Sequence, residues 1–152
     1  VVGKGVSRRQ VLETIQECKD LGFWIIGFFI YFFPQEDEHD RRQTMDLFKY
    51  FDVLLMTSLN EGLGSSILDA YLKKVPVVSG TSGGLADIVT AEKAMVCTSG
   101  APEEYCEKTE TLLSSPELAG GLTAKAYNFV VKNHSMAYIT KQYDQLFKEL
   151  IQ

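Results

Sequence analysis

The residues with the clearest chemical potential lie between Asn60 and Ala70, in the segment NEGLGSSILDA. Two acidic residues, Glu61 and Asp69, flank a Gly-Leu-Gly turn and a pair of serines. Glycine lets a backbone approach a ligand closely, and the start of a helix offers free N–H groups and the positive end of a dipole. This combination is typical of a phosphate-binding site, in which the carboxylates would accept hydrogen bonds from hydroxyl groups of the same ligand.

The spacing of this segment supports that interpretation. Backbone and hydroxyl groups of the site are expected from Gly62, Leu63, Gly64, Ser65 and Ser66. Because Asp69 follows Ser65 by four residues, it would lie on the same helix face, roughly 6 Å further along the axis. An ordinary turn between a strand and a helix could show the same pattern, since the helix dipole alone favours acidic residues near a helix start.

A second glycine-rich segment, SGTSGG at residues 79–84, lies between a short apolar run and a short helical one. Two such loops at the ends of neighbouring strands would form one crevice. Taken alone, this second segment is also compatible with an ordinary strand-to-helix turn.

The elements that must position these loops alternate along the chain. The pattern predicts strands at 1–2, 23–28, 52–57, 76–79 and 94–97. It predicts helices at 7–20, 44–50, 64–73, 85–89, 102–113, 116–133 and 135–150, with Tyr138, Tyr143, Leu146, Phe147 and Leu150 on the apolar side of the last. Short apolar strands separated by helices indicate an α/β fold with a doubly wound, Rossmann-like parallel sheet. Ligands of such folds bind where strands end, which points to the loops at 3–6, 28–35, 58–65 and 80–84.

Composition excludes several other classes of protein. The 152 residues are 45% hydrophobic and 23% charged, as in one soluble domain, and the net charge of −5 offers no footprint for nucleic acid. Three cysteines without a CxxC pair indicate reduced thiols rather than disulfides. The two histidines, His39 and His134, cluster with no other ligand type, so no metal site is expected. The longest apolar run, residues 23–33, is too short to span a membrane and is interpreted as a buried strand and an apolar loop.

The first residues, Val1 to Gly5, are typical of a strand end followed by a glycine turn. We therefore interpret residues 1–152 as a single domain, truncated at its N-terminus, with at least one strand missing upstream.

The stretch from Asp52 to Val89 resembles the signature region of the GT-B glycosyltransferases, specifically the retaining group 1, or family 4, enzymes. The resemblance rests on SLNEGLG at 58–64, on the acidic-x7-acidic spacing of Glu61 and Asp69, on VPVV at 75–78 and on GGLADIV at 83–89. Residues 1–5, the SPEL turn at 115–118 and the final helix are also similar to parts of that family. The resemblance thus covers almost the whole chain and implies the C-terminal, donor-binding half of a GT-B fold.

The resemblance also implies roles for individual residues. Glu61 matches the acid of the catalytic site that binds the hydroxyls of the transferred sugar, and residues 62–64 match the backbone that contacts sugar and diphosphate. Ser65 and Ser66 lie at the phosphate end of the helix, and Asp69 matches the acid that holds the nucleotide ribose. Asp69 and Asp87 stand where the family usually has Glu, so their carboxylates have one methylene less of reach.

The implied reaction moves a sugar from a nucleotide-diphosphate sugar to an acceptor hydroxyl with retention, without a cofactor or a metal ion. The implied partners are the nucleotide sugar, the protein's own missing N-terminal domain and an unknown glycan or lipid-linked acceptor. The family's basic donor-site loop would precede Val1, so we expect this fragment alone to be inactive. The expected location is the cytoplasm, with peripheral membrane attachment through the missing half left open.

Two other functions remain open from the sequence. The parent could be another GT-B enzyme, such as a sugar-nucleotide epimerase. Alternatively, the shortened acids at Asp69 and Asp87 would suit a non-catalytic nucleotide-binding module. The sequence leaves the nucleotide base, the sugar and the acceptor open.

Overall fold

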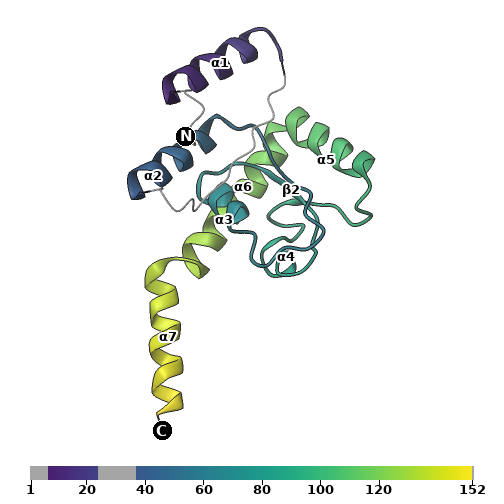
Figure 1. Ribbon diagram of the computed structural model, residues 1–152. Helices are drawn as coiled ribbons and strands as arrows, with labels where there is room; N and C mark the ends of the chain where they lie inside the picture. The colour runs from purple at the N-terminus through teal and green to yellow at the C-terminus, as the bar shows by residue number, and fades with distance from the viewer. Residues whose placement is uncertain (1–6, 24–36, 152) are drawn as a thin grey trace. The chain divides into compact units, whose positions relative to one another are not determined.

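The computed structural model of the chain describes residues 7–23 and 37–151 (Figure 1). The chain divides into two compact units, Val1–Asp37 and Glu38–Gln152, and each is described by itself. The strands expected at 1–2 and 23–28, and the loops at 3–6 and 28–35, lie outside the described residues, except for Phe23, which is not in a strand.

The described part of the first unit is one helix, α1 (Arg8–Asp20), which confirms the expected helix. Ser7 caps it: its side chain accepts a hydrogen bond from the backbone N–H of Gln10, whose own side chain accepts one from the backbone N–H of Ser7. This reciprocal arrangement satisfies two N–H groups that have no partner inside the helix.

The second unit is built on a parallel sheet, as expected. Its strands are β1 (Leu54–Met56), β2 (Val77–Ser79) and β3 (Met95–Val96), in the order β1-β2-β3. Leu54 pairs with Val77, and Met56 with Ser79. All three residues of β2 are buried, so both faces of this central strand are covered.

Five helices follow β1 at the expected places. They are α3 (Ser65–Leu72), α4 (Leu85–Ile88), α5 (Pro102–Ser114), α6 (Pro116–Asn133) and α7 (Met136–Leu150). Ser115 and Ser135 cap α6 and α7, and proline opens α5 and α6, where its missing N–H removes no helical hydrogen bond. Helices α5 and α6 close a core around β2 made of Val78, Cys97, Tyr105, Leu112 and Leu122.

One predicted boundary was wrong. The helix expected at 44–50 begins six residues earlier, as α2 (Glu38–Leu47), and ends in the 3₁₀ turn η1 (Phe48–Tyr50). Its polar first turn looks like a loop in sequence, but Glu38 lies at the favourable end of the helix dipole. Glu38 also pairs with Arg42, four residues later, at 2.6 Å, and such pairs support a helix that lacks an apolar stripe.

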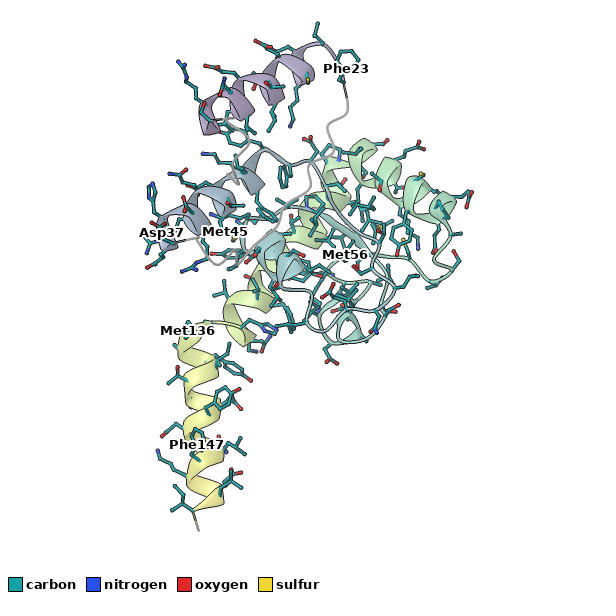
Figure 2. The ribbon with its side chains drawn as sticks, viewed as in Figure 1. Phe23, Asp37, Met45, Met56, Met136 and Phe147 are labelled. Carbon is teal, nitrogen blue, oxygen red and sulfur yellow. The ribbon has the colours of Figure 1, made fainter. Side chains whose placement is uncertain are left out.

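The last helix, α7, carries its apolar residues on the surface. Tyr138, Tyr143, Leu146, Phe147 and Leu150 share its expected apolar side, and none of its residues is buried. Met136 and Phe147 mark this helix in Figure 2. Within the residues that the structure describes, no helix has the length and apolar character needed to cross a membrane.

Candidate functional site

The candidate site lies where β1 and β2 end. These strands are parallel neighbours, and Met56, the last residue of β1 (labelled in Figure 2), is in register with Ser79, the last residue of β2. The loops that follow, residues 57–64 and 80–84, therefore leave the sheet from the same edge. This confirms that the two glycine-rich segments are brought together.

The two loops touch through their backbones. The N–H of Gly84 donates a hydrogen bond to the carbonyl of Glu61 at 2.9 Å. A Cβ atom at Gly84 would lie 1.5 Å from the carbonyl oxygen of Gly62, and one at Gly83 would lie 2.4 Å from that of Glu61. Contacts this close exclude any side chain, so glycine at 83 and 84 holds the loop that carries Glu61 in place.

Gly64 ends the first loop and starts α3. Its φ of +66° and ψ of +48° are left-handed, a conformation that glycine adopts without steric cost. No side chain caps the N-terminus of α3 among the described residues. The serine at 65 is exposed and the one at 66 half-buried, so the helix begins with uncapped N–H groups next to two hydroxyls. Such a helix start favours an anionic ligand.

Glu61 is held by its backbone, and its side chain remains available. The residue is half-buried, and its carboxylate makes no hydrogen bond or ion pair with another described residue. The side chains next to it on the loop, Leu59 and Leu63, are largely exposed. A carboxylate fixed by its backbone but free at its oxygens can accept hydrogen bonds from an incoming ligand.

Asp69 lies one turn into α3, is half-buried, and has a side chain that makes no hydrogen bond inside the described part of the chain. Burial raises the pKa of its carboxyl above the usual range, and the positive charge of Lys73 partly opposes this effect. Among the described residues, the Asp69 carboxylate is therefore also an acceptor without a hydrogen-bond donor, on the same helix as the uncapped N-terminus.

The other polar residues singled out in the sequence lie elsewhere. Asp87 is exposed on α4. His39 contacts Gln43 one turn further along α2, and the ring of His134 lies 5.2 Å from that of Phe129 at the end of α6. Across residues 7–23 and 37–151, no cluster of three or more His, Cys, Asp or Glu side chains could hold a metal ion.

Sequence reasoning missed a carboxylate that organises the loop after β3. Glu104 accepts hydrogen bonds from the backbone N–H groups of Thr98, at 3.0 Å, and Ser99, at 2.8 Å. It also pairs at 2.8 Å with Lys108, which donates in addition to the carbonyl of Val96. The bond from Lys108, then those from Ser99 and Thr98, holds the pKa of the Glu104 carboxyl well below its usual range. The four-residue spacing of Glu104 and Lys108 is the sequence signal that could have indicated this pair.

Sequence reasoning also missed the partner of Lys73. This residue, one turn after Asp69, has its Nζ atom 3.5 Å from Oδ1 of Asp46 on α2. The two residues are 27 positions apart, so nothing local in the sequence indicates their contact.

Comparison with known proteins now identifies the family. Residues 32–129 match the family described as "Glycosyl transferases group 1". The chain belongs to this family. The group 1 glycosyl transferase resemblance drawn from residues 52–89 is thereby confirmed, and the fold is that of the C-terminal half of a GT-B enzyme.

The matches to proteins of similar sequence cover only part of this chain. The chain is 30% identical over 97 residues to "Glycosyltransferase 1 domain-containing protein 1" of Xenopus tropicalis, covering 64% of this chain and 28% of that protein. It is 32% identical over 94 residues to "Trehalose synthase" of Pyrococcus horikoshii, covering 58% of this chain and 22% of that protein. The chain thus spans less than a third of the length of either relative.

Solved structures share the fold at lower identity. HepE from Anabaena, solved in complex with UDP, has a TM-score of 0.66 at 21% identity over 98% of this chain and 38% of its own. The C-terminal domain of the group 1 family protein LpcC from Francisella tularensis has a TM-score of 0.58 at 20% identity, over 86% of this chain and 66% of its own. These similarities support the fold of this group 1 glycosyl transferase domain.

Proposed function

We propose that this chain binds a nucleotide-diphosphate sugar and forms the donor half of a retaining glycosyltransferase. The observation that carries the proposal is the uncapped N-terminus of α3 beside two interlocked glycine loops. The carboxylates of Glu61 and Asp69, on the adjoining loop and helix, make no hydrogen bond or salt bridge with a described residue. The same fold in HepE has been solved with UDP and with UDP-glucose, which supports a nucleotide sugar as the ligand.

In this proposal the diphosphate lies at the start of α3. The N–H groups there, with Ser65 and Ser66, would stabilise the negative charge that the diphosphate gains as it leaves the sugar. Because these dipoles are fixed by the fold, no reorganisation is required when the charge develops. The proposed reaction invokes no metal ion.

Two carboxylates would hold the rest of the donor. Glu61 would accept hydrogen bonds from hydroxyls of the transferred sugar, next to the backbone of residues 62–64. Asp69, one turn into α3, would accept from the hydroxyls of the ribose. Neither carboxylate makes a hydrogen bond or salt bridge with a described residue, so neither would have to break one in order to bind.

Transfer to an acceptor hydroxyl would need the remainder of the protein. The matched residues are 28% and 22% of the two relatives, and we propose that the acceptor, a glycan or a lipid-linked glycan, binds to a preceding domain. Cytoplasmic location, with any membrane attachment provided by that domain, is part of the same proposal.

A thermal-shift panel on this chain with UDP, GDP and ADP tests donor binding. A nucleotide present at about 100 times its dissociation constant should stabilise the fold by about 2.7 kcal/mol. Asp69→Asn should weaken binding by about tenfold or more, because it removes a charged acceptor from the ligand's hydroxyls. The nucleotide that gives the largest thermal shift would identify the base of the donor.

The matched control is Asp144→Asn, which removes the same charge from the exposed helix α7 and should leave the shift unchanged. Absence of a shift with all three nucleotides would count against donor binding by this chain. A shift that is equal in Asp69→Asn and the unaltered chain would remove Asp69 from the site.

A further inference from the structure

The surroundings of the Asp69 carboxyl group disfavour the ionised form that ligand binding requires. To accept hydrogen bonds through both oxygens it must be ionised, since a protonated carboxyl turns one oxygen into a donor. Its half-buried position disfavours the ionised form and raises its pKa. Among the described residues it has no hydrogen-bond donor to counter this effect.

The nearest source of compensating charge is Lys73. It follows Asp69 by four residues, at the C-cap of α3, so the two side chains share a helix face. Helical side chains lean toward the N-terminus, which directs the Lys73 stem back toward Asp69 and the Asp69 carboxylate back toward Ser65. An acid followed four residues later by a base is also the favourable order for such a pair.

The Lys73 ammonium is shared with a second carboxylate. Its Nζ atom lies 3.5 Å from Oδ1 of Asp46 on α2, and the two side chains are 34% and 51% exposed. An ion pair this open contributes little to stability. The main consequence of the Lys73–Asp46 pair is that it affects how close the Lys73 ammonium lies to Asp69.

In the described structure, Lys73 is the charged group whose electrostatic interaction shifts the pKa of Asp69. Strands β1 and β2, which pack on α3, contain no titratable residue. Helix α6 also packs on α3 and carries the titratable residues Glu117, Lys125, Tyr127 and Lys132. Of these, Tyr127 is paired with a different lysine, Lys74, whose Nζ lies 4.9 Å from its ring centre.

We propose that Lys73 is a positioning residue that keeps the Asp69 carboxylate ionised for its ligand, and that Asp46 sets how strongly it does so. The proposal rests on the proposed function, in which Asp69 accepts hydrogen bonds from the donor nucleotide. Lys73 itself touches no ligand in this scheme, and it acts only through the charge that it brings to Asp69.

The first test follows the side-chain carboxyl of Asp69 by NMR through a pH titration of the ligand-free chain. Lys73→Met should raise the pKa of Asp69, because the compensating charge is gone. Asp46→Asn should lower it, because the competing carboxylate is gone. Lys73→Arg should behave as the unaltered chain does, since it keeps the charge.

Two neighbouring changes serve as matched controls. Lys74→Met removes the same charge one residue away, where the lysine side chain lies over the ring of Tyr127. This change should leave the pKa of Asp69 unaltered. Asp144→Asn is the control for Asp46→Asn. An unchanged titration in Lys73→Met, or an equal change in Lys74→Met, would overturn the proposal.

The second test measures, across the acidic pH range, the affinity for whichever of UDP, GDP and ADP the thermal-shift panel selects. Binding should weaken as Asp69 takes up its proton, and this weakening should begin at higher pH in Lys73→Met and at lower pH in Asp46→Asn. At a pH within this range, Lys73→Met should bind about two- to fivefold more weakly, while the difference should vanish well above it. A merely structural role for Lys73 would instead lower affinity equally at every pH.

The two proposals can fail separately. If the unaltered chain binds none of UDP, GDP and ADP at any pH, the proposed donor binding fails, while the NMR titration still decides whether Lys73 controls Asp69. If one of these nucleotides binds and Asp69→Asn weakens its binding, but the pH dependence is the same in Lys73→Met, only the role of Lys73 is overturned.

Discussion

Glycine occupies two contrasting environments in residues 38–151. At the candidate site, Cβ atoms at Gly64, Gly83 and Gly84 would lie 2.4 Å or less from another group of the protein. In the middle of α6, Cβ atoms at Gly120 and Gly121 would meet nothing within 4 Å. The sequence shows adjacent glycines in both places, but only the packing distinguishes a glycine that the fold requires from one that it merely contains.

The two pairs of adjacent glycines differ because different groups surround them. Residues 83–84 pass directly over the backbone of Glu61 and Gly62, so any added atom would force two loops apart. Gly121 lines an open cavity of about 520 Å³ next to Leu118, Leu122 and Lys125. Because the glycines at 64, 83 and 84 hold the loop that carries Glu61, they are required by the architecture of the candidate site. The glycines of α6 instead weaken that helix, because glycine leaves its backbone more conformational freedom.

The largest effect is expected for Gly84→Ala. Its Cβ would lie 1.5 Å from the carbonyl oxygen of Gly62, and the hydrogen bond from Gly84 to Glu61 would be lost as the loops separate. We expect a loss of about 3 kcal/mol or more in the free energy of unfolding, measured by urea denaturation. Gly62→Ala is the control on the opposing loop: its Cβ meets nothing within 4 Å, and we expect a change within about 0.5 kcal/mol. Equal losses in the two variants would contradict the interlocked loops.

A smaller loss is expected for Gly64→Ala. The left-handed backbone at φ +66° costs a side-chain-bearing residue about 1–2 kcal/mol. The new Cβ would also lie 2.4 Å from Cδ2 of Leu85, but that is the movable end of a side chain. We therefore expect a total loss of about 2–3 kcal/mol.

A double-mutant cycle with Leu85→Ala separates the two costs at Gly64. Leu85→Ala removes the atom in the way, so the further cost of Gly64→Ala should fall to the backbone part, about 1–2 kcal/mol. If the cost does not fall, the close approach of Leu85 contributes nothing.

Most of the fold in residues 52–150 could be predicted, because local signals coincide with element ends. Apolar runs such as 76–79 mark strands, while Pro102, Pro116 and Ser135 mark helix starts through backbone chemistry that acts locally. The early start of α2 was missed because charged residues at 38–42 are compatible with either a loop or a helix, and their pairing appears only once the helix is formed.

The candidate site was predictable only to the level of its loops. Parallel neighbouring strands must end at one edge, so the meeting of the loops at 58–64 and 80–84 follows from the topology. The near contact of Gly84 with Gly62, and the pairing of Asp46 with Lys73, depend on ångström-scale packing between distant segments. No periodicity or motif encodes such distances.

Gly121→Ala should act in the opposite direction from the changes at the site. Alanine in a helix interior is favoured over glycine by about 0.5–1 kcal/mol, and here nothing obstructs the added methyl. Urea denaturation should show a gain of that size, and the reverse change Ala124→Gly on the same helix should show a similar loss. A loss in Gly121→Ala would mean that the site and α6 glycines do not differ as their surroundings indicate.

The smallest effect is expected at Lys74, where a side chain occupies a position that suits glycine. Lys74 follows the last turn of α3 with a φ of +56°. The N–H groups of Lys74 and Val75 donate to the carbonyls of Tyr71 and Ala70, a helix-ending motif that usually places glycine at this residue. Lys74→Gly should relieve about 1 kcal/mol of backbone strain but lose about 0.5 kcal/mol of interaction with the ring of Tyr127.

The net gain in Lys74→Gly is therefore about 0.5 kcal/mol, and a second variant shows whether this cancellation is real. In a Tyr127→Leu background the ring interaction is already absent, so the same change should gain about 1 kcal/mol. Equal gains in the two backgrounds would show that the lysine makes no useful contact with the ring. A loss in both would show that position 74, unlike Gly64, carries no strain for glycine to relieve.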